Sequence, residues 1–269
     1  MKRVVIERDG LELVSEIEGP DRAPVVTLAH AQTLDRSSWD SLVSVLTDRY
    51  RVLRVDLRGH GESGEPAAEF TIEDLASDVV ATLDAHDVQA THFVGSSLGG
   101  MVGFALAIDH PDRMLSVTFV ATQGILPEAS HATLMANAEA LRSSGEPMSS
   151  LATRILARYM NSDFVDIDPD AYERLRDQIS GTSVEGYIRS SVAIMGMNFD
   201  DRLDRVEKPT MVIAGELDGP TPPERMRLYR DNIAGARMAV IAGAGHFPFA
   251  DQPDAFNRTL RGFLESLDC

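Results

Sequence analysis

Short apolar runs rich in Val and Ile alternate along the chain with longer segments in which apolar residues recur every three or four positions. The first pattern is typical of strands buried on both faces of a sheet, and the second of helices that pack on it. Asp9-Gly10, between the first two runs, predicts a hairpin turn. We therefore predict a mostly parallel sheet of eight strands, at residues 4–7, 11–18, 25–30, 50–57, 91–96, 116–122, 210–216 and 237–243.

The helical pattern predicts packing helices on both faces of this sheet, at residues 72–86, 98–110, 222–233 and 253–267. Between residues 123 and 205 the strands stop, and each apolar repeat has helical spacing. A long helical insertion between two strands is typical of a functional cap over a sheet. We therefore expect an α/β core domain formed by residues 1–122 and 206–269, and a helical cap at 123–205 inserted after the sixth strand.

Composition excludes several classes of function. The chain has 42 acidic and 25 basic residues, a net charge of −17, which argues against binding nucleic acid or an anionic membrane surface. No uncharged apolar stretch approaches the roughly 18 residues of a membrane helix, and charged residues precede any long apolar run at the N-terminus, so we expect a cytoplasmic protein. The only cysteine, Cys269, excludes an internal disulfide and a cysteine-based metal site. We predict no metal and no cofactor.

The sharpest local signal is Gly95-Ser96-Ser97-Leu98-Gly99, which lies where a predicted strand ends and a predicted helix begins. A serine at the centre of such a turn has a strained backbone, and the residues two positions before and after it must be small. Both of those residues are glycine here. Ser97 is therefore the candidate nucleophile, and a purely structural glycine-rich turn is the alternative interpretation.

A serine hydroxyl needs a neighbouring base, and the base needs a third group that fixes its tautomer. Of the seven histidines, His246 is the best candidate because it follows the last predicted strand within a glycine-rich loop. Asp218 follows the strand at 210–216, at the sheet edge where ligands gather in α/β proteins, and Glu216 is the competing acid. The order serine, acid, histidine is the one expected for this kind of site.

Acyl transfer also needs backbone N–H groups that stabilise the developing oxyanion. One donor is expected from the residue after the nucleophile, Leu98, and the other from the loop after the strand at 25–30. We assign the second donor to the main chain of Gln32.

With these residues identified, the chain resembles the α/β-hydrolase superfamily over nearly its whole length. The segment 54–63, Arg-Val-Asp-Leu-Arg-Gly-His-Gly-Glu-Ser, is similar to the superfamily's turn after its fourth strand. The resemblance implies that Ser97, Asp218 and His246 are nucleophile, acid and base, and that His60 supports the serine turn. Within the superfamily the chain is most similar to the 3-oxoadipate enol-lactonase group of small esterases and lactonases, through residues 30–39, 213–223 and 186–203. It departs from that group at Ala31 and in having no tryptophan in the cap.

The cap is expected to set specificity by supplying one wall of the substrate pocket. Apolar side chains at helical spacing serve more often as cap core than as ligand contacts, and flexible thioethers suit an adaptable wall. Arg154, Arg158, Arg174 and Arg189 are candidates to pair with a substrate carboxylate. The predicted pocket residues are His30, Leu126, Met135, Tyr159, Tyr187, Met195 and Phe247.

These features predict a cofactor-free serine hydrolase of carboxylic esters or lactones that acts through an acyl-enzyme on a small-molecule substrate. The same three side chains also support C–C bond hydrolysis next to a ketone, or perhydrolysis. A ligand receptor that keeps the three residues and turns over slowly is the alternative from another class. The sequence leaves the oligomeric state open.

Overall fold

The structure is a computed structural model that describes residues 1–267, so Cys269 lies outside the described residues. Within these residues the chain forms the predicted eight strands, most of them within two residues of the expected bounds. No helix among them combines the length and the apolar character needed to cross a membrane. The strands are β1 (Lys2–Arg8), β2 (Leu11–Glu18), β3 (Val25–Ala29), β4 (Arg51–Val55), β5 (Thr91–Ser96), β6 (Met114–Val120), β7 (Thr210–Gly215) and β8 (Arg237–Ile241).

The strands form one sheet in the order β1-β2-β4-β3-β5-β6-β7-β8. The β1–β2 hairpin and the β2–β4 pair are antiparallel, and every pair from β4 to β8 is parallel. Because parallel strands end on the same side, the loops after β3, β5, β7 and β8 meet at one edge of the sheet. The predicted fold class is confirmed.

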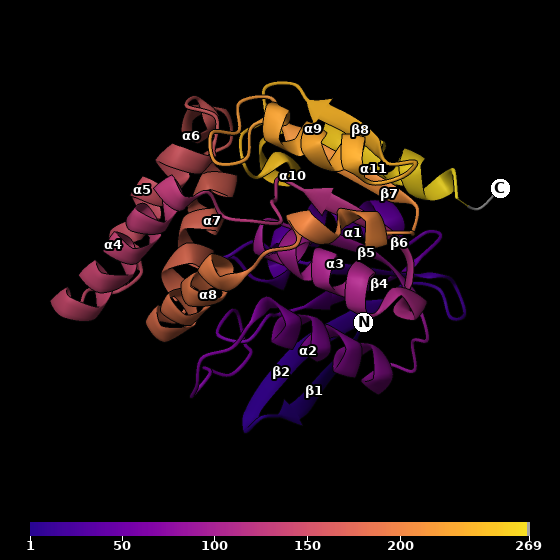
Figure 1. The fold of residues 1–269 in the computed structure, drawn as a ribbon, viewed down its shortest axis with the longest axis horizontal. Coiled ribbons are helices and arrows are strands. Elements are labelled where there is room, and N and C mark those ends of the chain that lie inside the picture. The colour runs from indigo at the N-terminus through magenta and orange to yellow at the C-terminus, as the bar shows by residue number, and fades with distance from the viewer. Residues whose placement is uncertain (268–269) are drawn as a thin grey trace.

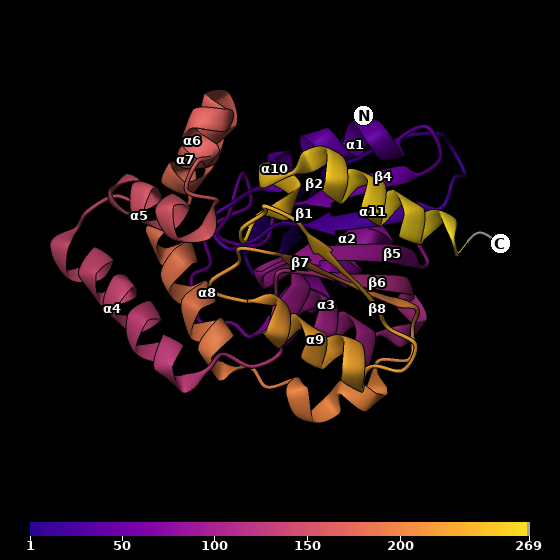
Figure 2. The same cartoon turned by 90° about the horizontal axis from the view of Figure 1, so that it is seen from above.

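Helices cover both faces of the sheet, as Figure 2 shows. Neighbouring strand residues point to opposite faces, so Phe93 packs into the core on one side and Val94 into the core on the other. One face carries α2 (Ile72–Ala85), α3 (Leu98–Asp109) and α9 (Pro223–Asn232). The other carries α1 (Asp40–Leu46), α10 (Pro248–Asp251) and α11 (Pro253–Glu265), with α1 and α10 both packed on α11.

The sequence analysis missed the four-residue α10 and one longer core helix, α1. Its apolar side chains at Leu42, Val43 and Leu46 have helical spacing, but the helix is only seven residues long. It begins directly after a short 3-10 helix, Arg36–Trp39, that Asp35 caps by accepting a hydrogen bond from the Ser37 N–H. A pattern this short predicts a helix weakly, so only the packing of α1 against α11 decides it.

Five helices, which we call the cap helices, lie together beyond the edge of the sheet where the parallel strands end (Figure 1). Within this group α4 packs on α8 and α5 packs on α7. Most of their buried apolar residues join the core cluster on the α1–α11 face, and Ala193 and Ile194 of α8 join the cluster on the other face. The cap helices and the sheet therefore share a continuous apolar interior. The cap helices are α4 (Glu128–Ser144), α5 (Ser149–Tyr159), α6 (Phe164–Ile167), α7 (Pro169–Gly181) and α8 (Val184–Gly196).

Candidate active site

Ser97 occupies the turn between β5 and α3 in the strained conformation that its sequence context predicts. Its φ is 49° and its ψ −110°, a left-handed backbone that a residue with a side chain rarely adopts. The neighbouring chain fixes this geometry, because the Ser97 N–H donates to the Val120 carbonyl at 2.9 Å and the Thr122 hydroxyl donates to the Ser97 carbonyl at 2.6 Å. The strain is thus held by β6 on one side of the turn.

The two glycines of the turn are required by close backbone contacts. A Cβ at Gly95 would lie 2.1 Å from the Gly99 carbonyl oxygen, and one at Gly99 would lie 2.2 Å from the Ala29 carbonyl oxygen. These distances are far below van der Waals contact, so any side chain would push α3 away from β5 and β3. The small residues let the strand and helix approach each other and leave the Ser97 side chain at the sheet edge.

His246 and Asp218 lie beside Ser97, although they are far away in sequence. The Ser97 Oγ is 3.1 Å from His246 Nε2, and His246 Nδ1 is 3.0 Å from both carboxylate oxygens of Asp218. Since an ionised carboxylate only accepts hydrogen bonds, Nδ1 carries the proton and Nε2 is free to accept the serine proton. The arrangement has the geometry that activates a serine hydroxyl.

The Asp218 carboxylate is buried but well partnered. It accepts hydrogen bonds from the Thr221 backbone N–H at 3.0 Å and from the Thr221 hydroxyl at 2.5 Å. Burial alone would raise the pKa of Asp218, but the charge of His246 and these hydrogen bonds outweigh burial and lower its pKa. The competing acid, Glu216, instead accepts from the Gly243 N–H at the surface. The structure therefore places Asp218, and not Glu216, against His246.

The two expected oxyanion donors also lie at this edge. Leu98 is the first residue of α3, where the N–H groups of a helix have no partner within the helix, and Gln32 lies in the loop after β3. Among the described residues, neither the Leu98 N–H nor the Gln32 N–H has a hydrogen-bond acceptor. Both groups are thus available to a ligand atom.

His30 holds the peptide bond that contains the Gln32 N–H. Its Nδ1 lies 2.8 Å from the Ala31 carbonyl oxygen, and its Nε2 accepts from the Leu57 N–H at 3.0 Å. Burial lowers the pKa of His30 to about 4, so the ring stays neutral and keeps this tautomer near pH 7. His60, which the family resemblance assigns to supporting the serine turn, packs on His30 with ring centres 5.2 Å apart.

A cavity of about 330 Å³ opens between the sheet edge and the cap helices, and Ser97, Gln32 and His246 line it. Of the pocket residues predicted from sequence, Leu126, Tyr159 and Tyr187 line the cavity. No Asp or Glu among the described residues lines it, whereas Arg154 and Arg158 of α5 both do. Neither arginine has an ion-pair partner within residues 1–267. The wall facing Ser97 is therefore positively charged in a protein of net charge −17.

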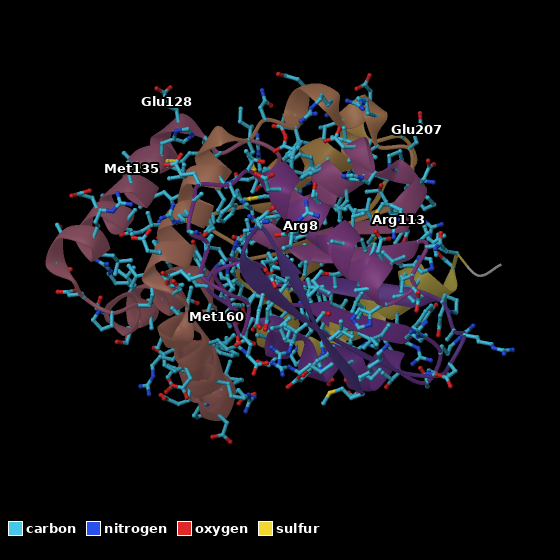
Figure 3. All side chains as sticks on the ribbon, turned by 90° about the horizontal axis from the view of Figure 1, so that it is seen from below. Arg8, Arg113, Glu128, Met135, Met160 and Glu207 are labelled. Atoms are coloured by element: carbon cyan, nitrogen blue, oxygen red, sulfur yellow. The ribbon has the colours of Figure 1, made fainter. Side chains whose placement is uncertain are left out.

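Four residues that were predicted to line the pocket do not line the cavity, so the prediction was wrong for them. His30 is fully buried beneath the loop, and Phe247 is packed among Tyr159, Phe249 and the His246 ring. Met135 lies on α4, the outermost cap helix, with 49% of its surface exposed (Figure 3). Met195 is half-buried on a side of α8 away from the cavity lining. Helical spacing marks an apolar stripe but does not say which neighbour it faces.

Residues 28–259 match the model of the alpha/beta hydrolase family. The chain belongs to this family. The 3-oxoadipate enol-lactonase 2 of Acinetobacter baylyi is 28% identical over 242 residues, which cover 90% of this chain and 89% of that enzyme. The enol-lactonase from Burkholderia xenovorans LB400 superposes with a TM-score of 0.91 at 31% identity, covering 97% of this chain and all of the other. A thermophilic esterase from Thermogutta terrifontis has the same TM-score at 27% identity and covers 99% of each chain.

The comparisons confirm that this alpha/beta hydrolase chain is an enzyme of the hydrolase class and that its sequence resembles the enol-lactonase group.

Sequence reasoning missed several polar groups at the site. Thr221 was detectable, because an aspartate three residues before a threonine often accepts from the threonine N–H in a local turn. Gln123 and Asn137, which also line the cavity, carry no such local signal.

Proposed function

We propose that this hydrolase cleaves carboxylic esters or lactones through an acyl-enzyme formed on Ser97. The observation that carries the proposal is the continuous chain of contacts from the Ser97 hydroxyl through His246 to Asp218, with both links at about 3 Å. Its position on the wall of a cavity gives a substrate access to the hydroxyl. The names of the similar enzymes, enol-lactonases and an esterase, support the same bond type.

The first half of the proposed reaction forms the acyl-enzyme. Ser97 Oγ attacks the carbonyl carbon while its proton passes to His246 Nε2, and the carbonyl oxygen becomes an oxyanion. The Gln32 and Leu98 N–H groups donate to that oxygen, and Asp218 stabilises the imidazolium. When the tetrahedral intermediate collapses, the alcohol oxygen leaves with the proton from His246. In a lactone this alcohol remains tethered to the acyl group.

The second half repeats these proton transfers with water. His246 Nε2 removes a proton from water, the resulting hydroxide attacks the acyl carbon, and the bond to Ser97 Oγ breaks as that oxygen regains the proton. The product acid and the free enzyme result, so one water is consumed per ester bond cleaved.

The charge of the cavity supports substrates that carry an anionic group away from the reacting carbonyl. Arg154 and Arg158 lie four positions apart on α5, and like charges at this spacing destabilise a helix unless a counterion is present. Burial raises the pKa of Tyr187, another residue of the cavity wall, while hydrogen bonds with the Asn137 and Ser191 side chains and the charges of these two arginines act in the opposite direction. A carboxylate bound there would neutralise the pair by charge-assisted hydrogen bonds.

The test replaces the proposed nucleophile and looks for the covalent intermediate. Ser97→Ala should lower hydrolysis of 4-nitrophenyl acetate and of a simple lactone by roughly 10⁶-fold, to the level left by binding alone. An alkyl fluorophosphonate should add one phosphonyl group to the parent enzyme, and mass spectrometry of peptides should locate it on Ser97.

The matched control is Ser96→Ala, because Ser96 is the neighbouring serine but is fully buried, and its hydroxyl has no hydrogen-bond partner within residues 1–267. This variant should keep its activity and its labelling. Parental activity in Ser97→Ala, or labelling at another residue, would refute the proposal.

A further inference from the structure

The Gln32 side chain reaches away from the sheet and contacts cap helix α8. Its amide nitrogen lies 3.2 Å from the Tyr187 carbonyl oxygen, 2.9 Å from the Ser190 hydroxyl and 3.0 Å from the Ser191 hydroxyl. Gln32 therefore joins two parts of the site: its backbone N–H is at the sheet edge and its side chain is on the cap. We call this set of hydrogen bonds the Gln32–α8 contact.

The orientation of this amide is fixed by its partners. A carbonyl oxygen can only accept, so the group facing Tyr187 must be the amide NH₂. Ser190 and Ser191 donate their own hydroxyl protons to the same carbonyl, at 3.0 and 2.7 Å, which leaves their lone pairs free to accept from Gln32. Both serines are 0% exposed, so their hydroxyls are shielded from solvent. A buried network with every donor partnered holds its members in one geometry.

The residue after Gln32 shows why such a constraint is needed. Thr33 has φ of 71°, and a β-branched residue in this left-handed region is strained. Its carbonyl accepts from the Thr182 hydroxyl at 3.0 Å, and further along the loop Ser37 accepts from the Gln178 amide at 2.7 Å. Strained backbone persists only where surrounding contacts over-determine it. The end of α7 and the first turns of α8 supply those contacts to the loop after β3.

The opposite side of the same peptide bond is held by the core. His30 contacts the Ala31 carbonyl, and this carbonyl and the Gln32 N–H belong to one planar peptide group. The peptide is therefore positioned by His30 from the core and by the Gln32–α8 contact from the cap. Removing the second restraint leaves the N–H free to rotate away from the point where charge develops.

We propose that Ser190 and Ser191 are positioning residues for the oxyanion site, because they fix the Gln32 peptide through its side chain. The proposal rests on the proposed function, in which the Gln32 N–H donates to the oxyanion. An oxyanion donor accelerates acyl transfer only when it is already aimed at the developing charge. In this arrangement α8 of the cap controls the rate of acylation and not only the shape of the pocket.

The experiment weakens the contact from each side. The double variant Ser190→Ala with Ser191→Ala removes two acceptors, neither of which lines the cavity, and Gln32→Met keeps the backbone N–H and the side-chain length but removes the amide. The triple variant combines them. Ser180→Ala is the matched control, since the Ser180 hydroxyl donates to a helix carbonyl on α7 but touches neither Gln32 nor the cavity.

Three quantities are measured: the acylation rate constant with 4-nitrophenyl acetate, the KM, and the inhibition constant of phenylboronic acid. The Ser97 oxygen bonds to the boron atom, and the Ser97 hydroxyl proton passes to His246. The resulting tetrahedral boronate places one of its oxygens where the oxyanion forms. We expect acylation to slow about tenfold in the double variant and in Gln32→Met, a fraction of the loss seen on deleting an oxyanion donor. In the double variant, KM should stay within about twofold of the parental value. The inhibition constant of phenylboronic acid should rise by the same factor by which the acylation rate constant falls.

The triple variant should be no slower than Gln32→Met, because the serines act only through that side chain. If the double variant acylates at the parental rate while Ser97→Ala is inactive, the positioning role is wrong and the proposed function stands. Additive losses in the triple variant would also overturn the positioning role. Activity in Ser97→Ala would refute the proposed function itself, so the two failures are distinguishable.

Discussion

The two walls of the cavity are built in different ways. On the sheet side, Ser97, Asp218 and His246 lie one, three and five residues after the ends of β5, β7 and β8, and each is hydrogen-bonded to its neighbour. On the cap side, Arg154 and Arg158 project from α5 without an ion-pair partner in the described part of the chain. The functional side chains of the sheet wall are thus hydrogen-bonded to one another, whereas the two arginines of the cap wall are available to pair with an anionic ligand. Under the proposed function, the sheet wall carries the reaction and the cap wall selects the substrate.

Besides the apolar interior that the cap helices share with the sheet, polar contacts also link the two walls. Beside the Gln32–α8 contact, the His246 N–H donates to the Tyr159 carbonyl at 2.5 Å. Asp251 bridges the same boundary, since its carboxylate accepts from the Gly245 N–H at 2.7 Å and from the Asn161 N–H at 3.3 Å. The loop that carries His246 is therefore fixed partly by the chain that leaves α5. A substitution at this boundary should therefore shift groups on both walls of the cavity.

The largest expected effect is on the sheet wall. Asp218→Asn should lower kcat/KM by roughly 10⁴-fold, because an amide cannot hold the Nδ1–H tautomer of His246 as a carboxylate does. Steady-state hydrolysis of 4-nitrophenyl acetate measures the loss. Glu216→Gln is the control, because that exposed acid does not touch the histidine, and it should remain within about threefold of the parent. Equal losses in the two variants would contradict the assignment of the acid.

The next effect separates the cap wall from the sheet wall. Arg154→Gln combined with Arg158→Gln should lower kcat/KM for the mono-4-nitrophenyl ester of a six-carbon diacid by about 30-fold, as one charge-assisted contact of roughly 2 kcal/mol would. The uncharged 4-nitrophenyl hexanoate should change by less than about threefold. Arg142→Gln on α4 removes an exposed arginine outside the cavity and should leave both substrates unaffected. Equal losses with the charged and uncharged esters would count against an anion site.

A pH-dependent effect is expected at the boundary between the walls. Burial, with the nearby Asp218 charge, raises the pKa of Asp251 to about 6, whereas in the unfolded chain it is about 3.9. Below pH 4 both states are protonated, so the contribution of Asp251 to stability is fully present. This stabilising contribution is lost as the pH rises to about 6 and above. The unfolded chain then ionises Asp251 freely, whereas the folded protein must ionise a buried carboxyl group.

The Tm of the parent minus that of Asp251→Asn should therefore fall between pH 4 and pH 8. Differential scanning calorimetry across this range measures the difference, with both proteins in the same buffers. The variant also loses an acceptor for one N–H, but that loss does not depend on pH. A constant Tm difference would show that Asp251 titrates as an exposed aspartate.

The smallest effect concerns the strained loop on the sheet wall. Thr33→Gly should raise the free energy of unfolding by about 1 kcal/mol, because glycine accepts φ of 71° without strain and the buried Thr33 hydroxyl has no hydrogen-bond partner among the described residues. The relief outweighs the larger backbone entropy that glycine loses on folding. Urea unfolding measures the change, and a less stable variant would contradict the presence of strain.

Much of the sheet wall was predictable because its signals are local. A serine between glycines at a strand end, and a histidine and an aspartate just after later strands, follow from residue type and position along the chain. The parallel topology then brings these strand ends to one edge. The cap wall was less predictable, as Met135 and Met195 show, because an apolar helix stripe has the same spacing whether it faces a ligand, a neighbouring helix or solvent.

The sequence by itself determined the strand order along the chain, the strained serine turn and the three residues that follow β5, β7 and β8, because each depends on backbone propensity and on contacts between near neighbours. Only the tertiary structure decided that Asp218 rather than Glu216 faces His246, that His30 lies beneath the loop rather than in the pocket, and that Gln32 contacts α8. These outcomes depend on distances between segments that are far apart in sequence. Such distances are set by how the helices pack on the sheet and not by any local pattern.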